Sequence, residues 1–125
     1  MKQTRNTPQR EMVREVMANN YDHPTAEEIY AVIHEHYPNV SFATVYRNLN
    51  LLAEQGEIAR LHMPEGPDHY DITTRPHYHF LCRKCHRIVD VELPYAEHFD
   101  NITPEGCTTE SHILTLVGLC DKCSE

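Results

Sequence analysis

Two pairs of cysteines with the spacing Cys-x-x-Cys place the strongest constraint on how this chain can fold. They are Cys82 with Cys85 and Cys120 with Cys123. The tight turn within each pair brings two sulfurs to one point, and two such pairs complete the tetrahedral thiolate shell that zinc prefers. We therefore predict a structural Zn(II) site. The 34 residues between Cys85 and Cys120 exceed the separation in an ordinary zinc ribbon, so the metal is expected to join the ends of a small sheet.

Two disulfides, or four inert thiols, are the alternative interpretation of these cysteines. The segment Met1-Lys2-Gln3-Thr4-Arg5 is not an apolar export signal, so an oxidising compartment is not implied. No apolar run approaches the roughly 20 residues that are needed to cross a bilayer. We expect a soluble, cytoplasmic protein with no membrane partner.

The first half of the chain predicts three helices and a hairpin. Thr7-Pro8 is typical of a helix start, and apolar residues at helical spacing extend that helix over residues 8–18. A capping box at Thr25-Ala26-Glu27-Glu28 starts a second helix, which must end before Pro38. Ser41 caps a third helix that ends at Gly56. Two short apolar segments around a turn then indicate a hairpin over residues 57–72.

Three short helices followed by a hairpin are the layout of a winged helix-turn-helix, in which the third helix enters the major groove of DNA. The third predicted helix exposes Thr44 and Arg47, and the arginine fork can pair with guanine or phosphate. The formal charge of −8 counts against unaided DNA binding, although the acidic excess lies mostly after residue 60. A small structural α+β lobe without DNA contact is the alternative.

Five motifs in order along the chain resemble the ferric uptake regulator family of bacterial metal-dependent repressors. These motifs are Arg5-Asn6-Thr7-Pro8-Gln9-Arg10, His23-Pro24-Thr25-Ala26-Glu27-Glu28-Ile29-Tyr30, Ala43-Thr44-Val45-Tyr46-Arg47-Asn48-Leu49, His77-x-His79-x-x-Cys82-x-x-Cys85 and Cys120-x-x-Cys123. The resemblance implies an α+β fold, with a winged-helix DNA-binding domain at residues 1–73, a hinge at 74–76 and a zinc-stapled α/β dimerisation domain at 77–125. It also implies a homodimer on a double-stranded operator of two-fold symmetry, contacted by Ser41, Thr44, Tyr46 and Arg47.

A second metal site is predicted beside the first cysteine pair. His77 and His79 are two residues apart, so on a strand both imidazoles leave the same face. A returning strand at residues 87–91 can bring Asp90 opposite them, while Asp71 ends the hairpin. The family resemblance places one ion among His23, Asp71, His77, His79 and Asp90. Nitrogen and oxygen ligands without thiolate suit Fe(II) or Mn(II), although each residue taken alone can equally be an ordinary polar side chain.

The two aspartates in this set indicate which branch of the family the chain resembles. Peroxide-sensing members have aspartate at both places, whereas ferric uptake repressors generally have glutamate. In the peroxide branch, the resemblance implies that bound Fe(II) reacts with hydrogen peroxide and oxidises a ligand, His23 or His77. Pro76 and Tyr78 stand where ferric uptake repressors commonly carry ligands of a third metal site, which speaks against that site here.

Three other functions remain open at this point. A ferric uptake or manganese regulator would respond to metal level without peroxide chemistry. A metal-dependent hydrolase needs an open position on the metal and a general base, and the five-ligand cluster offers neither, so we do not expect an enzyme. A zinc-stapled protein-interaction module would not bind duplex DNA.

Outside these sites, we expect Cys107 to be a small buried residue and assign no partner to His112. The remaining histidines are expected at the surface or in packing; they are His34, His36, His62, His69, His86 and His98.

Overall fold

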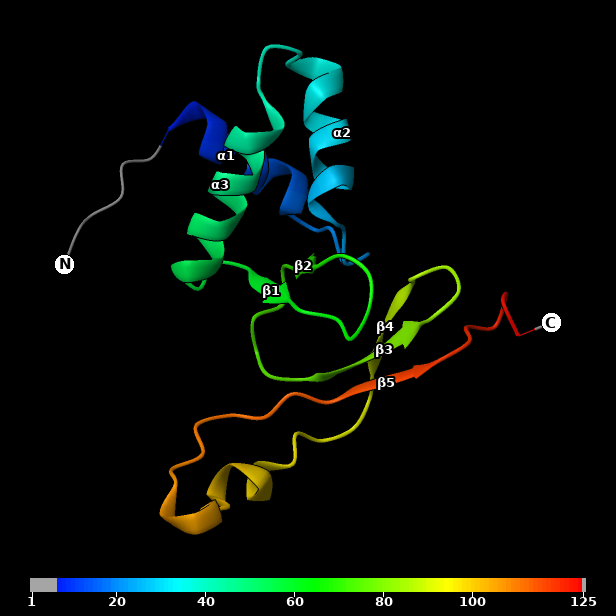
Figure 1. Cartoon of the computed structure of the whole chain (residues 1–125). Helices are drawn as coiled ribbons and strands as arrows, with labels where there is room; N and C mark the ends of the chain where they lie inside the picture. The colour runs from blue at the N-terminus through cyan, green and yellow to red at the C-terminus, as the bar shows by residue number, and fades with distance from the viewer. Residues whose placement is uncertain (1–6, 125) are drawn as a thin grey trace. The chain divides into compact units, whose positions relative to one another are not determined.

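The structure is a computed structural model that describes residues 7–124 (Figure 1). It divides into two compact units, one ending at Thr74 and the other beginning at Arg75. Arg5 and Asn6 of the first family motif lie outside the described residues. No helix in the described part of the chain is long and apolar enough to cross a membrane.

Three helices form most of the first unit. They are α1 (Pro8–Met17), α2 (Ala26–His36) and α3 (Phe42–Glu54). Each begins where the sequence predicts, because Thr7, Thr25 and Ser41 each accept a hydrogen bond from a backbone amide of the first turn. The predicted capping box is confirmed: Thr25 Oγ1 accepts from the Glu28 amide at 3.2 Å, and the Glu28 carboxylate accepts from the Thr25 amide at 3.0 Å.

The helices enclose one apolar core, which also receives two residues from the segment that follows them. Its buried residues are Val13, Met17, Ala26, Ile29, Ile33, Val45, Leu49, Leu52, Ile58 and Tyr70. Gly56, with a φ of 78°, allows the chain to turn out of α3 into the hairpin. The hairpin pairs β1 (Ala59–Leu61) with β2 (His69–Asp71) in antiparallel register. The first unit is therefore a winged helix-turn-helix.

The second unit contains a three-stranded mixed sheet in the order β4-β3-β5. β3 (Tyr78–Cys82) runs antiparallel to β4 (Ile88–Val91) and parallel to β5 (Thr115–Gly118). Two short 3₁₀ helices, η1 (Glu97–Asn101) and η2 (Pro104–Gly106), lie in the long connection from β4 to β5. Together the two units confirm the predicted α+β fold class.

Cys107 corrects one expectation from the sequence. The residue was expected to be buried, but its side chain is exposed. It directly follows η2, in a stretch from residue 101 to 108 in which every residue is exposed, so no apolar layer is available to cover it.

Replacing Thr25 by alanine should destabilise the first unit by about 1 kcal/mol, because the Glu28 amide loses its side-chain acceptor at the start of α2. Urea unfolding followed by circular dichroism at 222 nm reports on this unit, since all three α-helices belong to it. Thr103→Ala is the matched control, because Thr103 precedes η2 without a side-chain cap bond. Equal stability of both variants would contradict the assigned role of the cap.

Candidate metal centres and nucleic-acid interface

The four paired cysteines meet because β3 and β5 are parallel neighbours. Cys82 at the end of β3 is in register with Gly118 at the end of β5, so both pairs emerge at the same end of the sheet. The four sulfurs lie within 4.8 Å of one another, and the sulfurs of Cys85 and Cys120 are 3.8 Å apart. A zinc–sulfur bond of about 2.3 Å implies a spacing of about 3.8 Å between sulfurs of a tetrahedron. The donor set and its spacing therefore fit zinc.

The surroundings of Cys82 favour the thiolate, which is the form that binds metal. The Cys85 amide donates to Cys82 Sγ at 3.5 Å, and this backbone hydrogen bond is the largest cause that lowers the pKa of Cys82 to about 5. At Cys120 burial raises the pKa, but the amide of Cys123 and further donors outweigh it, so that the pKa is lowered overall. All five cysteines are free thiols, so the disulfide interpretation is wrong.

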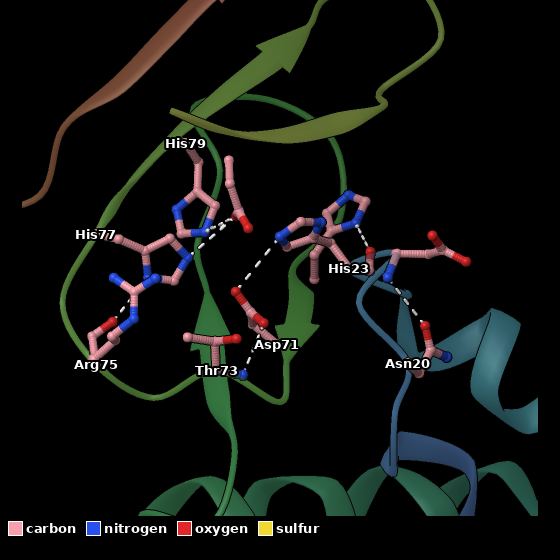
Figure 2. A network of polar contacts seen from close by, with 10 residues as sticks. Asn20, His23, Asp71, Thr73, Arg75, His77 and His79 are labelled. Carbon is pink, nitrogen blue, oxygen red and sulfur yellow. Dashed lines mark hydrogen bonds and ion pairs between the residues drawn. The ribbon is translucent and has the colours of Figure 1, made fainter. Parts of the chain in front are cut away.

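His23 and Asp71 form one group of potential metal ligands, within the first unit (Figure 2). His23 Nε2 lies 3.5 Å from Asp71 Oδ2, and both side chains are buried. The other carboxylate oxygen of Asp71 accepts a hydrogen bond from the Thr73 amide at 2.9 Å, which fixes the carboxylate with Oδ2 toward the histidine. A buried histidine and carboxylate with their ligand atoms facing one another are suited to sharing a cation.

His77, His79 and Asp90 form a second group, within the second unit. Asp90 pairs with His79 across β3 and β4, as the sequence predicts for the returning strand. Asp90 Oδ1 lies 3.2 Å from His77 Nε2 and 3.5 Å from His79 Nε2, and the two imidazole centroids are 4.3 Å apart. His77 Nδ1 donates to the Arg75 carbonyl at 2.8 Å (Figure 2), so its Nε2 carries the lone pair that a metal requires.

A polar network that the sequence did not predict lies around Tyr78, the residue between His77 and His79. The Tyr78 hydroxyl accepts from the Ala96 amide at 2.9 Å and donates to His112 Nε2, 2.6 Å away. His112 Nδ1 in turn donates to Asp100 at 2.8 Å. Hydrogen bonds from His112 and Tyr95 lower the pKa of Asp100, so this carboxylate remains charged. His112 thus has two partners, and Tyr78 is part of a fully bonded network instead of a ligand set.

The predicted DNA-reading face of α3 is partly exposed. Ser41 caps the helix, where its hydroxyl donates to Thr44 Oγ1 at 3.0 Å. Arg47 is exposed one turn further along. A surface cavity of about 280 Å³ lies between this face and the start of α1, lined by Thr7, Gln9, Arg10, Thr44, Arg47, Asn48 and Leu51. Arg10 in this lining is buried, whereas Arg47 is exposed, so Arg47 is the arginine here that is suited to contact a phosphate backbone.

Tyr46 is held by the hairpin. Its hydroxyl accepts a hydrogen bond from Arg60 Nη2 at 3.1 Å, and the guanidinium lies 5.9 Å from the centroid of its ring. Arg60 also donates to Asn50 on α3 and to Asp68 in the hairpin turn, at 3.2 and 2.7 Å. The sequence does not predict this role of Arg60, because nothing in the local pattern distinguishes Arg60 from an ordinary surface arginine.

Comparison with known proteins places these features in one family. Residues 1–117 match the ferric uptake regulator family. The chain belongs to this family. It is 35% identical over 121 residues to the peroxide operon regulator of Bacillus subtilis, a match that covers 95% of this chain and 83% of the relative.

Two solved structures extend the likeness from sequence to fold. The Helicobacter pylori ferric uptake regulator, described as having three functional metal-binding sites, gives a TM-score of 0.81 at 29% identity and covers 97% of this chain and 83% of its own. The Campylobacter jejuni peroxide stress regulator gives 0.72 at 32% identity, with 93% and 89% covered. This protein is thus a metal-dependent, DNA-binding transcriptional regulator and not an enzyme. Its cysteine cluster and its histidine and aspartate ligands are the two kinds of metal site typical of the family.

Replacing Cys120 by serine should release zinc and unfold the sheet of the second unit, because three thiolates cannot complete the tetrahedral shell. Zinc content by elemental analysis and hydrogen exchange in β5 measure the two effects. Cys107→Ser is the matched control and should keep a full complement of zinc, since Cys107 is exposed and outside the cluster. Retention of zinc by both variants would rule out the four-cysteine site.

Proposed function

We propose that this regulator is a repressor that senses peroxide through a histidine bound to Fe(II). The observation that carries the proposal is that both carboxylates in the histidine-containing ligand groups are aspartates, Asp71 and Asp90. This is the pattern of the peroxide-sensing branch that the sequence resembles. The peroxide operon regulator of Bacillus subtilis, at 35% identity, supports the same branch.

In this proposal one regulatory ion is shared by His23 and Asp71 of the first unit and by His77, His79 and Asp90 of the second. Two or three ligands alone are few for Fe(II) or Mn(II), whereas five nitrogen and oxygen donors suit either ion. The chain also limits how far the groups can separate. Asp71 and His77 are joined by five intervening residues, which span at most about 20 Å when fully extended. The second group therefore meets the first at a high effective concentration.

The proposed ion would couple metal binding to DNA binding. An ion that binds better when both ligand groups converge stabilises that arrangement, and linkage then requires metal and DNA to strengthen each other's binding by the same factor.

We place the DNA contacts at Ser41, Thr44, Tyr46 and Arg47, within a DNA-binding domain of residues 1–73 that is followed by a hinge at 74–76. The protein would act in the cytoplasm, where the bacterial chromosome lies.

A homodimer through residues 77–125 belongs to the same proposal. β5 forms one edge of the sheet, and Leu116 and Val117 on it are 45% and 48% exposed. Ile113, just before β5, is 83% exposed. An unpaired strand edge with exposed apolar side chains is suited to pairing with a second copy. Two copies would present two α3 helices to a two-fold operator.

Peroxide should release the Fe(II) form from DNA and leave the Mn(II) form bound. Bound Fe(II) would supply one-electron chemistry toward peroxide, to which Mn(II) is much less prone. In the overall reaction a ligand imidazole, that of His23 or His77, would gain one oxygen atom from hydrogen peroxide, with water as the second product. The measurement is fluorescence anisotropy on a duplex selected from random sequences in the presence of Mn(II). Release of both forms, or of neither, would reject the sensing mechanism.

Mass spectrometry of the same samples separates this function from its nearest alternative. A gain of about 16 Da on the peptide containing His23 or His77 marks oxidation of a ligand histidine. An unmodified protein after treatment with Fe(II) and peroxide would favour a ferric uptake or manganese regulator that responds to metal level alone.

His77→Ala should abolish metal-activated DNA binding and leave the zinc content intact, because His77 faces Asp90 and lies outside the cysteine cluster. His98→Ala is the matched control, since His98 is an exposed histidine of the same unit. Loss of zinc in His77→Ala would show that the two metal sites are not separate. Normal activation would remove His77 from the ligand set.

A further inference from the structure

His69 is a buried histidine that the proposed function does not use. It begins β2, is 5% exposed and lies two residues before Asp71. Its Nδ1 is 2.6 Å from the carbonyl oxygen of His23. Because a carbonyl can only accept, Nδ1 carries a proton and donates it to this bond. A side chain from β2 thus holds the backbone at His23.

The backbone at His23 needs such support. Its φ is 55°, in the left-handed region that residues other than glycine seldom occupy. Pro24 follows, and a residue before proline favours an extended conformation. A doubly disfavoured conformation persists only when its surroundings impose it, and such strain is typical of functional sites.

Three contacts between this segment and β2 impose the conformation. The His69 side chain bonds to the His23 carbonyl at 2.6 Å, the Tyr70 amide donates to the Pro24 carbonyl at 2.8 Å, and Thr25 forms an isolated bridge with His69. Of these three contacts, only the bond from His69 is made by a side chain. It is also the contact that holds His23, the residue with the strained backbone. A substitution can therefore remove it without altering β2.

The two nitrogens of the His69 imidazole differ in what they do. His69 Nε2 is buried and has no hydrogen-bond partner among the described residues. Burying a polar nitrogen without a partner is unfavourable, so this side of the ring does not favour histidine over a hydrocarbon ring. What a hydrocarbon ring would lack is the bond from Nδ1 to the His23 carbonyl.

We infer that His69 is a positioning residue, which holds His23 in its left-handed conformation so that the His23 imidazole faces Asp71. The inference rests on the proposed function, in which His23 and Asp71 bind the regulatory ion. Without the bond from His69, His23 relaxes toward the extended conformation and its ring leaves the carboxylate, 3.5 Å away in the structure. Metal affinity then falls although every ligand is still present.

Two amide side chains that differ in length by one methylene give a sharp test. The side-chain amide of asparagine reaches the place of Nδ1, whereas that of glutamine reaches the place of Nε2. His69→Asn should keep Mn(II) affinity within about threefold of the parent protein, and His69→Gln should lower it by roughly 10- to 100-fold, the range for losing a residue that orients a ligand. Affinity is measured by titrating Mn(II) into the full-length, zinc-loaded protein, with zinc content and melting temperature recorded for each variant.

His69→Phe adds a readout that a purely structural role would not give. It should weaken Mn(II) binding as His69→Gln does, so that Mn(II) raises its melting temperature by less than that of the parent. A purely structural role would lower the melting temperature without Mn(II) and leave the increment caused by Mn(II) unchanged. His62→Phe is the matched control and should bind Mn(II) normally, since His62 is exposed and its imidazole contacts Asp68 in the hairpin turn.

The outcomes separate the inference from the proposed function. Equal Mn(II) affinity in His69→Asn and His69→Gln, or parent affinity in His69→Phe, overturns the positioning role and leaves the regulatory site in place. Failure of the parent protein to bind Mn(II), or parent affinity in His23→Ala, overturns the proposed site itself.

Discussion

The second unit depends on a parallel pairing that the chain reaches only after a long connection. β3 and β5 lie side by side, although more than thirty residues separate them, and closing a loop of this length costs chain entropy. Few buried apolar side chains oppose that cost. Among the described residues of this unit, the buried hydrophobic ones are Tyr78, Leu81, Cys82, Ile88 and Cys120. Two of these are cysteines of the cluster, so a zinc ion bound there would supply much of the stability that a larger core would provide.

The sequence predicts most of the first unit because its signals are local. Helix starts follow from side chains that bond an amide three residues away, as Thr25 does with Glu28. The hairpin follows from apolar segments around a turn, and the approach of Asp90 to His79 follows from strand alternation and a tight return. In each case the residues that determine the structure lie within a few positions of it.

The features that the sequence does not predict depend on partners distant along the chain. Tyr78 bonds to His112, Arg60 bonds to Tyr46, and His69 bonds to the His23 carbonyl, over separations of 34, 14 and 46 residues. No periodicity encodes such pairs. The exposed Cys107 was missed for a related reason, because composition describes how often a residue type is buried and not where a 3₁₀ turn will place it.

β3 carries one residue from each candidate metal site within five residues, His79 near its start and Cys82 at its end. The strand that presents the proposed regulatory ligand His79 therefore ends at the cysteine cluster. This imposes an order on demetallation. Under the proposed function, a mild chelator would remove the regulatory ion and spare the fold, so that the protein could be loaded again, whereas a chelator strong enough to extract zinc would unfold the strand itself. Loss of the ion at the imidazoles would then be reversible, and loss of the ion at the thiolates would not.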